Sequence, residues 1–247
     1  MVRGSESAWQ YLVEAQTMAI ILAIETTTEA CSCALLVDGK VSESYELMPR
    51  RHAREVLPMI RRLLDESGYS LTNIDVIACS RGPGSFTGLR INAGVVQGLA
   101  FAADLPVIPV STLSALALQI SDSTGSVQVF ACMDARISEV YCGFFNCSGS
   151  VPRLLGEEVL VAPSAIRMPA GSFNGQFCAG GNGLVFANEF PEAVSSQLTI
   201  TCPDILPRAS AVARLAEVEF ARNNFVSPEA MVPVYLRDKV AFKTGER

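Results

Sequence analysis

The sequence has few of the residues from which catalytic and metal centres are commonly built. Its 247 residues include a single histidine, His52. The eight cysteines contain no Cys-x-x-Cys pair, so the usual ligand spacing of structural zinc is absent. Several cysteines lie in apolar segments, where a free cysteine behaves as a small hydrophobic residue. We therefore predict no metal site and no disulfide, but reduced thiols in a cytoplasmic protein.

Long apolar runs and a positive net charge are also missing. No run approaches the roughly 20 residues of a membrane-spanning helix, so we expect no membrane partner. The net charge of −6 argues against a broad basic surface for nucleic acid. Basic residues cluster at 49–54 and 60–62, where we favour a solvated helix face over an RNA groove. With 49% hydrophobic and 18% charged residues, the composition indicates a well-packed globular protein.

The first 17 residues lack the features of a signal peptide. They have no basic start, apolar stretch or small-residue cleavage site. Met18 directly precedes the first apolar run and is the natural start. We interpret residues 1–17 as an upstream extension or tag remnant, outside the fold.

The remaining sequence is typical of a mixed α/β protein. Hydrophobic periodicity and turn residues predict strands at 19–24, 31–37, 40–47, 74–79 and 107–110, helices at 52–67 and 87–103, and a further helix capped by Ser111. Strands that first meander and then alternate with helices indicate a mixed sheet.

A weak internal repeat indicates two related subdomains. Residues 20–37 and 129–145 both show a strand, an acidic turn and a second strand. Glu25 and Asp134 end the first strand of each copy. We place the subdomains at 18–113 and 114–247, with an extended tail at 232–242 returning to the first.

The turn after the first strand carries one candidate site. Glu25 is followed by Thr26, Thr27 and Thr28. A carboxylate beside hydroxyls and amides can hold a metal-bound phosphate. The alternative is a β-turn whose acidic residue caps free amides, and the pattern by itself favours this turn.

The segment SRGPGSFTGLR, residues 80–90, carries another. Gly82, Gly84 and Gly88 let backbone amides approach a ligand at the positive end of the following helix. No Lys-Ser/Thr pair follows, which excludes a Walker loop, and Ser85 does not stand in a G-x-S-x-G motif. The alternative is a connector in which Ser85 or Thr87 caps the helix.

The helix at 87–103 is apolar on nearly every side and contains the small-residue pair Gly94 and Gly98. Such a helix is either central to its own fold or half-covered by a partner. We favour the partner.

Five segments together resemble one family. ILAIETTTEACSCALLVDGKV, HAREVLPMIRRLL, RGPGSFTGLRINAGVVQGLA, MDARISEVYCG and VPVYLRDKVA occur in the order found in the TsaB family, also called YeaZ. The resemblance implies an actin-like ATPase (ASKHA) fold with two ribonuclease-H-like subdomains, the second reduced. It also implies a role in making threonylcarbamoyladenosine at position 37 of tRNAs that read ANN codons.

The resemblance further implies a subunit that is not itself the catalyst. In that pathway the paralogue TsaD transfers the threonylcarbamoyl group, assisted by TsaB and the ATPase TsaE. TsaD carries a His-x-x-x-His metal motif on its early helix, whereas here Val56 stands four residues after His52. We therefore expect neither that metal nor the transferase chemistry. Some members of the family carry an old peptidase label. This sequence offers no nucleophile or metal dyad to support it.

The family's partner face implies TsaD as the partner, or a second copy in a homodimer. Its expected contact residues lie on the helices at 52–67 and 87–103: His52, Val56, Met59, Leu63, Ile91, Gly94, Val95, Gly98 and Leu99. TsaE would bind through the TsaB–TsaD complex, and tRNA would be touched only indirectly.

The fold's nucleotide features remain only as traces. Glu25, Thr26, Thr27, Gly82, Gly84 and Ser85 would form a vestigial site. Asp134 begins a second loop that lacks the glycine a phosphate needs, and residues 179–183 stand where a glycine pair contacts adenosine. We expect no required cofactor and leave weak ATP or ADP binding open. The rival hypothesis is an ATP-using actin-like enzyme, a kinase or the transferase itself.

Overall fold

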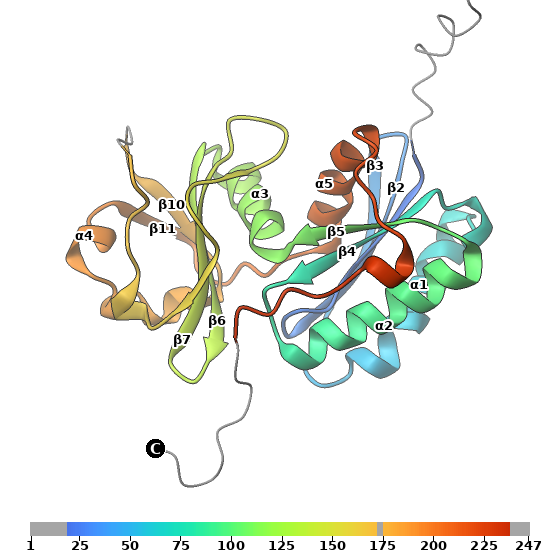
Figure 1. Cartoon of the computed structure of the whole chain (residues 1–247), viewed down its shortest axis with the longest axis horizontal. Coiled ribbons are helices and arrows are strands. Elements are labelled where there is room, and N and C mark those ends of the chain that lie inside the picture. Colours follow the sequence, from blue (N-terminus) through green and yellow to red (C-terminus); the bar gives the residue numbers. More distant parts are fainter. Residues whose placement is uncertain (1–18, 172–174, 238–247) are drawn as a thin grey trace, which may run out of the picture.

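The structure, a computed structural model, consists of two β-sheets placed side by side (Figure 1). It describes residues 19–171 and 175–237. The predicted extension at 1–17 and the tail from 238 to 242 lie outside the described residues.

The first sheet has the order β3-β2-β1-β4-β5. Its strands are β1 (Ile21–Glu25), β2 (Ala30–Val37), β3 (Lys40–Leu47), β4 (Val76–Gly82) and β5 (Val107–Ser111). The first three pair antiparallel, while β4 runs parallel to both β1 and β5. The five predicted strands are thus present, and β4 continues beyond the predicted end into the glycine-rich segment.

Helices cover both faces of this sheet. Successive side chains along each strand point to opposite faces, so both faces carry apolar residues that need to be covered. Leu22 and Ile24 share a core with α1 (His52–Ser67) and α2 (Phe86–Ala103), on one face. Ile21 and Ala23 pack on the other face with α5 (Ala209–Ala221). Helix α1 has the predicted bounds and ends at Gly68, whose φ of 73° is left-handed. Two short 3₁₀ helices, η2 (Leu71–Asn73) and η5 (Pro228–Ala230), complete this half.

The second sheet repeats the topology of the first in the order β8-β7-β6-β10-β11, with β9 also paired to β7. Its strands are β6 (Gln128–Arg136), β7 (Glu139–Asn146), β8 (Arg153–Leu154), β9 (Val159–Val161), β10 (Phe177–Gly180) and β11 (Leu198–Cys202). The long helices of the first half are replaced by η3 (Pro163–Ala165), η4 (Asn182–Glu189) and the one-turn α4 (Glu192–Ser195). This confirms two ribonuclease-H-like units with a reduced second one.

Helix α3 (Thr112–Thr124) connects the two sheets. It packs on β6 and β10 of the second sheet and on β4 and β5 of the first. Ser111 caps it by accepting a hydrogen bond from the amide of Ser114 at 3.1 Å, as predicted. The boundary placed at 113/114 lies within the first turn of this helix, and the chain returns to the first sheet with α5. Among the described helices, none is long and apolar enough to cross a membrane.

Candidate functional site

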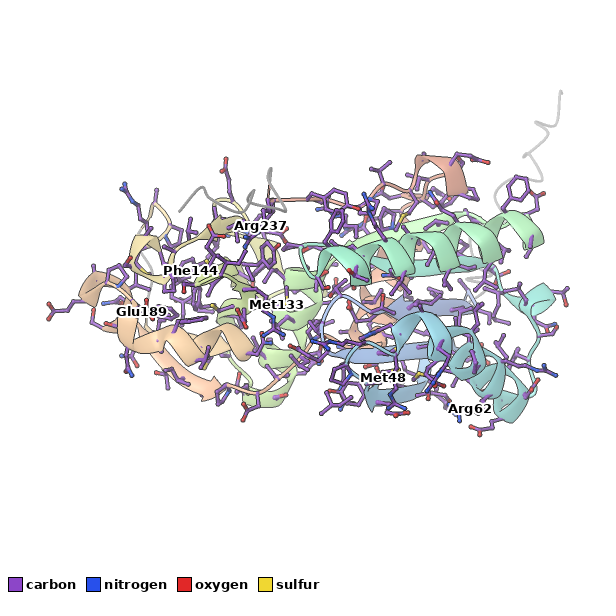
Figure 2. All side chains as sticks on the ribbon, turned by 90° about the horizontal axis from the view of Figure 1, so that it is seen from below. Met48, Arg62, Met133, Phe144, Glu189 and Arg237 are labelled. Carbon is purple, nitrogen blue, oxygen red and sulfur yellow. The ribbon has the colours of Figure 1, made fainter. Side chains whose placement is uncertain are left out.

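A cleft of about 690 Å³ lies between the two halves. Its walls are the turn after β1, the first turns of α1 and α2, the β6–β7 turn and the C-terminal segment. Figure 2 shows Met133 and Arg237, both lining residues, near the junction of the two halves. The sequence-predicted loops around Glu25, Ser85 and Asp134 are therefore brought together here.

Glu25 does not open on this cleft. Its side chain is fully buried and accepts hydrogen bonds from the amide of Thr27 and the hydroxyl of Ser80 on β4. Burial raises the pKa of the Glu25 carboxyl, against the lowering effect of these hydrogen bonds. The residue acts as a cap inside the turn, which is the alternative that the pattern favoured.

The glycines of the 80–90 segment hold it against the same turn. Ser85 N–H donates to the carbonyl of Thr27 at 2.8 Å, and the Thr26 hydroxyl donates to the carbonyl of Gly88 at 2.9 Å. A Cβ at Gly84 would lie 2.6 Å from that of Thr27, and a Cβ at Gly88 would overlap the carbonyl of Thr26. The glycines therefore permit contact between two loops of this chain.

Ser85 also caps α2 by accepting a hydrogen bond from the Gly88 amide at 3.4 Å. Of the two predicted capping residues, Ser85 is the one that the structure uses. The buried hydroxyl of Thr27 lies beside Gly84 and has no hydrogen-bond partner within the described residues, and Thr27 is one of the residues that line the cleft.

The second loop is occupied by an arginine. Arg136 forms ion pairs with Asp134, at 3.1 Å, and with Glu29 of the first half. Asn182 supports the loop by accepting a hydrogen bond from the Asp134 amide at 3.0 Å. Sequence reasoning missed the pairing of Arg136 with Glu29, because the two residues are 107 positions apart and no motif connects them.

The glycines of the segment at 179–183, where an adenosine contact was expected, pack against other parts of the chain. A Cβ at Gly180 would lie 2.6 Å from the Ile120 side chain, and one at Gly181 would overlap the carbonyl of Cys132. The glycines of this segment are therefore needed for contacts inside the chain.

The four predicted contact residues of α1 belong to the core. His52, Val56, Met59 and Leu63 are between 0 and 7% exposed and face the sheet. His52 Nε2 lies 3.0 Å from the carbonyl oxygen of Ala30. In the isolated chain these four side chains are thus covered by their own sheet, so their predicted contact with a partner stays a prediction.

The exposed face of α1 is instead mostly charged. It carries Arg51, Arg54, Arg61 and Arg62, the last labelled on the outer side of the helix in Figure 2. Leu57 is its large apolar residue and is 49% exposed. The arginines of the basic cluster are therefore exposed to solvent at the beginning of α1 and along its outer face.

The predicted contact residues of α2 are less buried than those of α1. Ile91, Val95 and Leu99 are half-buried, while Gly94 and Gly98 are exposed. A Cβ at either glycine would meet nothing within 4 Å. Nearby on the helix, Phe101 is 75% exposed. The small-residue pair thus opens to the surface, and we call this set of residues the α2 face.

The cysteines carry free thiols, and five of them are buried. Burial raises the pKa of Cys31, Cys33 and Cys142 to about 12, so these thiols are not poised as nucleophiles. Within the described residues, no group of three or more His, Cys, Asp or Glu side chains is placed to hold a metal.

Known proteins resemble this chain over most of its length. The family model of TsaD, tRNA N6-adenosine threonylcarbamoyltransferase, matches residues 45–244. The tRNA threonylcarbamoyladenosine biosynthesis protein TsaB of Escherichia coli (strain K12) is 39% identical over 226 residues, 90% of this chain and 96% of that protein. TsaB of Haemophilus influenzae is 38% identical over 237 residues, 90% of this chain and 95% of that protein.

A solved structure of YeaZ from Pseudomonas aeruginosa is similar in fold as well. It matches with a TM-score of 0.82 and 41% identity, covering 89% of this chain and 100% of that chain. Another structure from the same organism, described as similar to peptidase YEAZ, matches equally well. The similarity therefore extends through both sheets.

Proposed function

The chain belongs to the TsaB family, also called YeaZ, and we propose that it is a non-catalytic subunit that binds and activates the transferase TsaD. In this role it supports threonylcarbamoyl transfer to tRNA in the cytoplasm and helps to form the binding site for TsaE. It contacts tRNA only through the complex.

The α2 face is the observation that carries this proposal. Its half-buried aliphatic side chains flank two exposed glycines, so a partner helix can approach the backbone closely. Glycine in a helix interior costs about 1 kcal/mol relative to alanine, and none of the described residues uses the space at Gly94 or Gly98. The match of the chain to the TsaD family model supports TsaD as the occupant, because related chains present related helices. A second copy of this chain is the other occupant of the same face.

The chemistry of the described residues supports a non-catalytic role. The single histidine is buried against the sheet, and Glu25 and Asp134 are engaged by neighbouring groups. The two carboxylates among the described residues that line the cleft, Glu29 and Asp134, both pair with Arg136. We extend the proposal to the cofactor: activity in the complex needs no nucleotide bound to this subunit.

The complex can be tested by charging the α2 face. Val95→Glu and Leu99→Glu should abolish co-purification with TsaD, because a carboxylate cannot be buried there without a partner charge. Val185→Glu is the matched control, since Val185 is 72% exposed on η4 of the other half. Circular dichroism should show all three variants folded. Retention of TsaD by the folded Val95→Glu variant would overturn the proposal.

Calorimetry separates this role from the rival enzyme. Titrating the isolated chain with ATP and magnesium should give weak or no binding and no ADP release. Tight binding with turnover would instead favour an ATP-using enzyme. Incubating the chain with TsaD, with and without chelator, should leave TsaD intact; cleavage would support the peptidase label.

A further inference from the structure

The C-terminal segment Met231–Arg237 crosses from one half of the molecule to the other. Figure 1 shows it running along α2 and ending beside β6. Met231 is 1% exposed in the core of the first half, and its carbonyl accepts a hydrogen bond from Gln97 of α2 at 3.0 Å. The segment is thus anchored to α2 at its start.

Its middle is attached to the end of β4 and the beginning of α2. Val234 N–H donates to the carbonyl of Arg81 at 2.7 Å. A Cβ at Gly82 would lie 2.6 Å from the carbonyl oxygen of Val234, so the two backbones are in close contact. The ring of Tyr235 lies 5.5 Å from that of Phe86, the first residue of α2. Three successive contacts therefore follow the same edge of the first half.

Its end is attached to the second half. Leu236 packs with the core cluster that includes Met133 and Phe145. The Arg237 guanidinium forms an ion pair with Glu139 at 2.7 Å and donates to the carbonyl of Ala135 at 3.0 Å. The Arg237 side chain is only 14% exposed, so this pair is shielded from water and salt more than a surface pair is.

The β6–β7 turn that receives Arg237 has an unfavourable backbone. Arg136, Ile137 and Ser138 have φ of 65°, 55° and 55°, in the left-handed region that residues with a side chain rarely adopt. Such a turn persists only where its surroundings hold it. Asp134 holds this turn from within the hairpin by pairing with Arg136, and Glu29 of the first half and Arg237 hold it from outside.

We propose that residues 231–237 form a strap that sets the width of the cleft by tying the beginning of α2 to the β6–β7 turn. The strap forms one wall of the cleft through Val234, Tyr235, Leu236 and Arg237. Its release lets the second half move away from the first and relaxes the left-handed turn. This inference concerns the isolated chain and stands whether or not TsaD binds the α2 face.

Hydrogen–deuterium exchange of the full chain tests the strap. In Arg237→Ala, amides of residues 131–138 and of 82–88 should exchange about tenfold faster or more, the effect of losing one charge-assisted hydrogen bond. Exchange in β2 and α5 should stay unchanged. Arg222→Ala is the matched control, because that arginine, directly after α5, pairs with Glu219 of the same helix and spans no junction.

A second variant separates the strap from a local effect of the arginine. Tyr235→Ala removes the ring contact with Phe86 and leaves Arg237 in place, yet it should also accelerate exchange at 131–138. The strap would be disproved by a response confined to 131–138 in Arg237→Ala, or by no response there in Tyr235→Ala. A uniform acceleration through β2 and α5 in both variants would also disprove it, since a strap acts at the junction.

Discussion

Gly88 has no room for a methyl group, because the carbonyl of Thr26 occupies the position of a Cβ. Gly94, two turns further along α2, has nothing within 4 Å of that position. Two glycines of one helix thus have opposite roles: Gly88 joins two loops inside the chain, and Gly94 leaves the surface open. This difference in packing should appear in the free energy of unfolding when each glycine is replaced by alanine.

We predict that Gly88→Ala destabilises the protein by about 1–3 kcal/mol, the usual cost of overpacking. Gly94→Ala should stabilise it by about 0.5–1 kcal/mol, because alanine favours a helix over glycine. Urea unfolding of the two variants beside the native chain measures both. Equal stability of the two variants would contradict the packing described for Gly88.

At the scale of the element, α1 divides into a core face and a solvent face. Met59 is 1% exposed in the cluster shared with β2, whereas Leu57 is 49% exposed. A helix of this kind is stabilised mostly by burial of its apolar stripe. A partner bound to the α2 face can therefore contact only the solvent-exposed side chains of α1.

We predict that Met59→Ala lowers the free energy of unfolding by about 2–5 kcal/mol, as expected for a large-to-small change in a core. Leu57→Ala should change it by less than about 0.5 kcal/mol and should weaken the complex with TsaD. Denaturant titration and co-purification give the two readouts. If Met59→Ala left stability unchanged, the buried stripe would be misassigned.

At the scale of the whole molecule, the two halves are joined by polar contacts as well as by α3. Arg136 pairs with Glu29 at the cleft, and Glu158 of the second half accepts the hydroxyl hydrogen of Ser111 at the start of α3. Burial raises the pKa of Glu158, as it does for Glu25. The stability of the molecule should therefore depend on pH through both carboxyls.

A carboxyl whose pKa is raised in the folded state binds its proton more tightly there than in the unfolded chain. Its contribution to stability is complete below its ordinary pKa of 4.5 and is lost as the pH rises through the raised folded value. We predict that Glu25→Gln, which cannot ionise, flattens the loss of stability as the pH rises above 4.5. Glu158 still titrates in the same direction, so part of the slope remains. The measurement is the free energy of unfolding of the variant and the native chain as a function of pH. Parallel curves for the two would contradict the prediction.

The sequence by itself determined the elements and the family. The strand at 40–47 and the helix at 52–67 have the predicted bounds, because alternation, helical periodicity and the glycine at 68 act over a few neighbouring residues. The echo between Glu25 and Asp134 likewise predicted two related sheets, since it is a repeat of local patterns. The five matching segments and their order carried the resemblance to the TsaB family.

The tertiary structure decided which of those residues are buried and which distant residues they contact. An apolar stripe on α1 is the same in sequence whether its own sheet or a partner covers it, so the burial of Val56 and Met59 could not be foreseen. Glu25 meets Ser80 across 55 positions and Arg136 meets Glu29 across 107, and local patterns hold no information on such pairs. These contacts between distant residues turned an apparent phosphate loop into a junction between two segments of one chain.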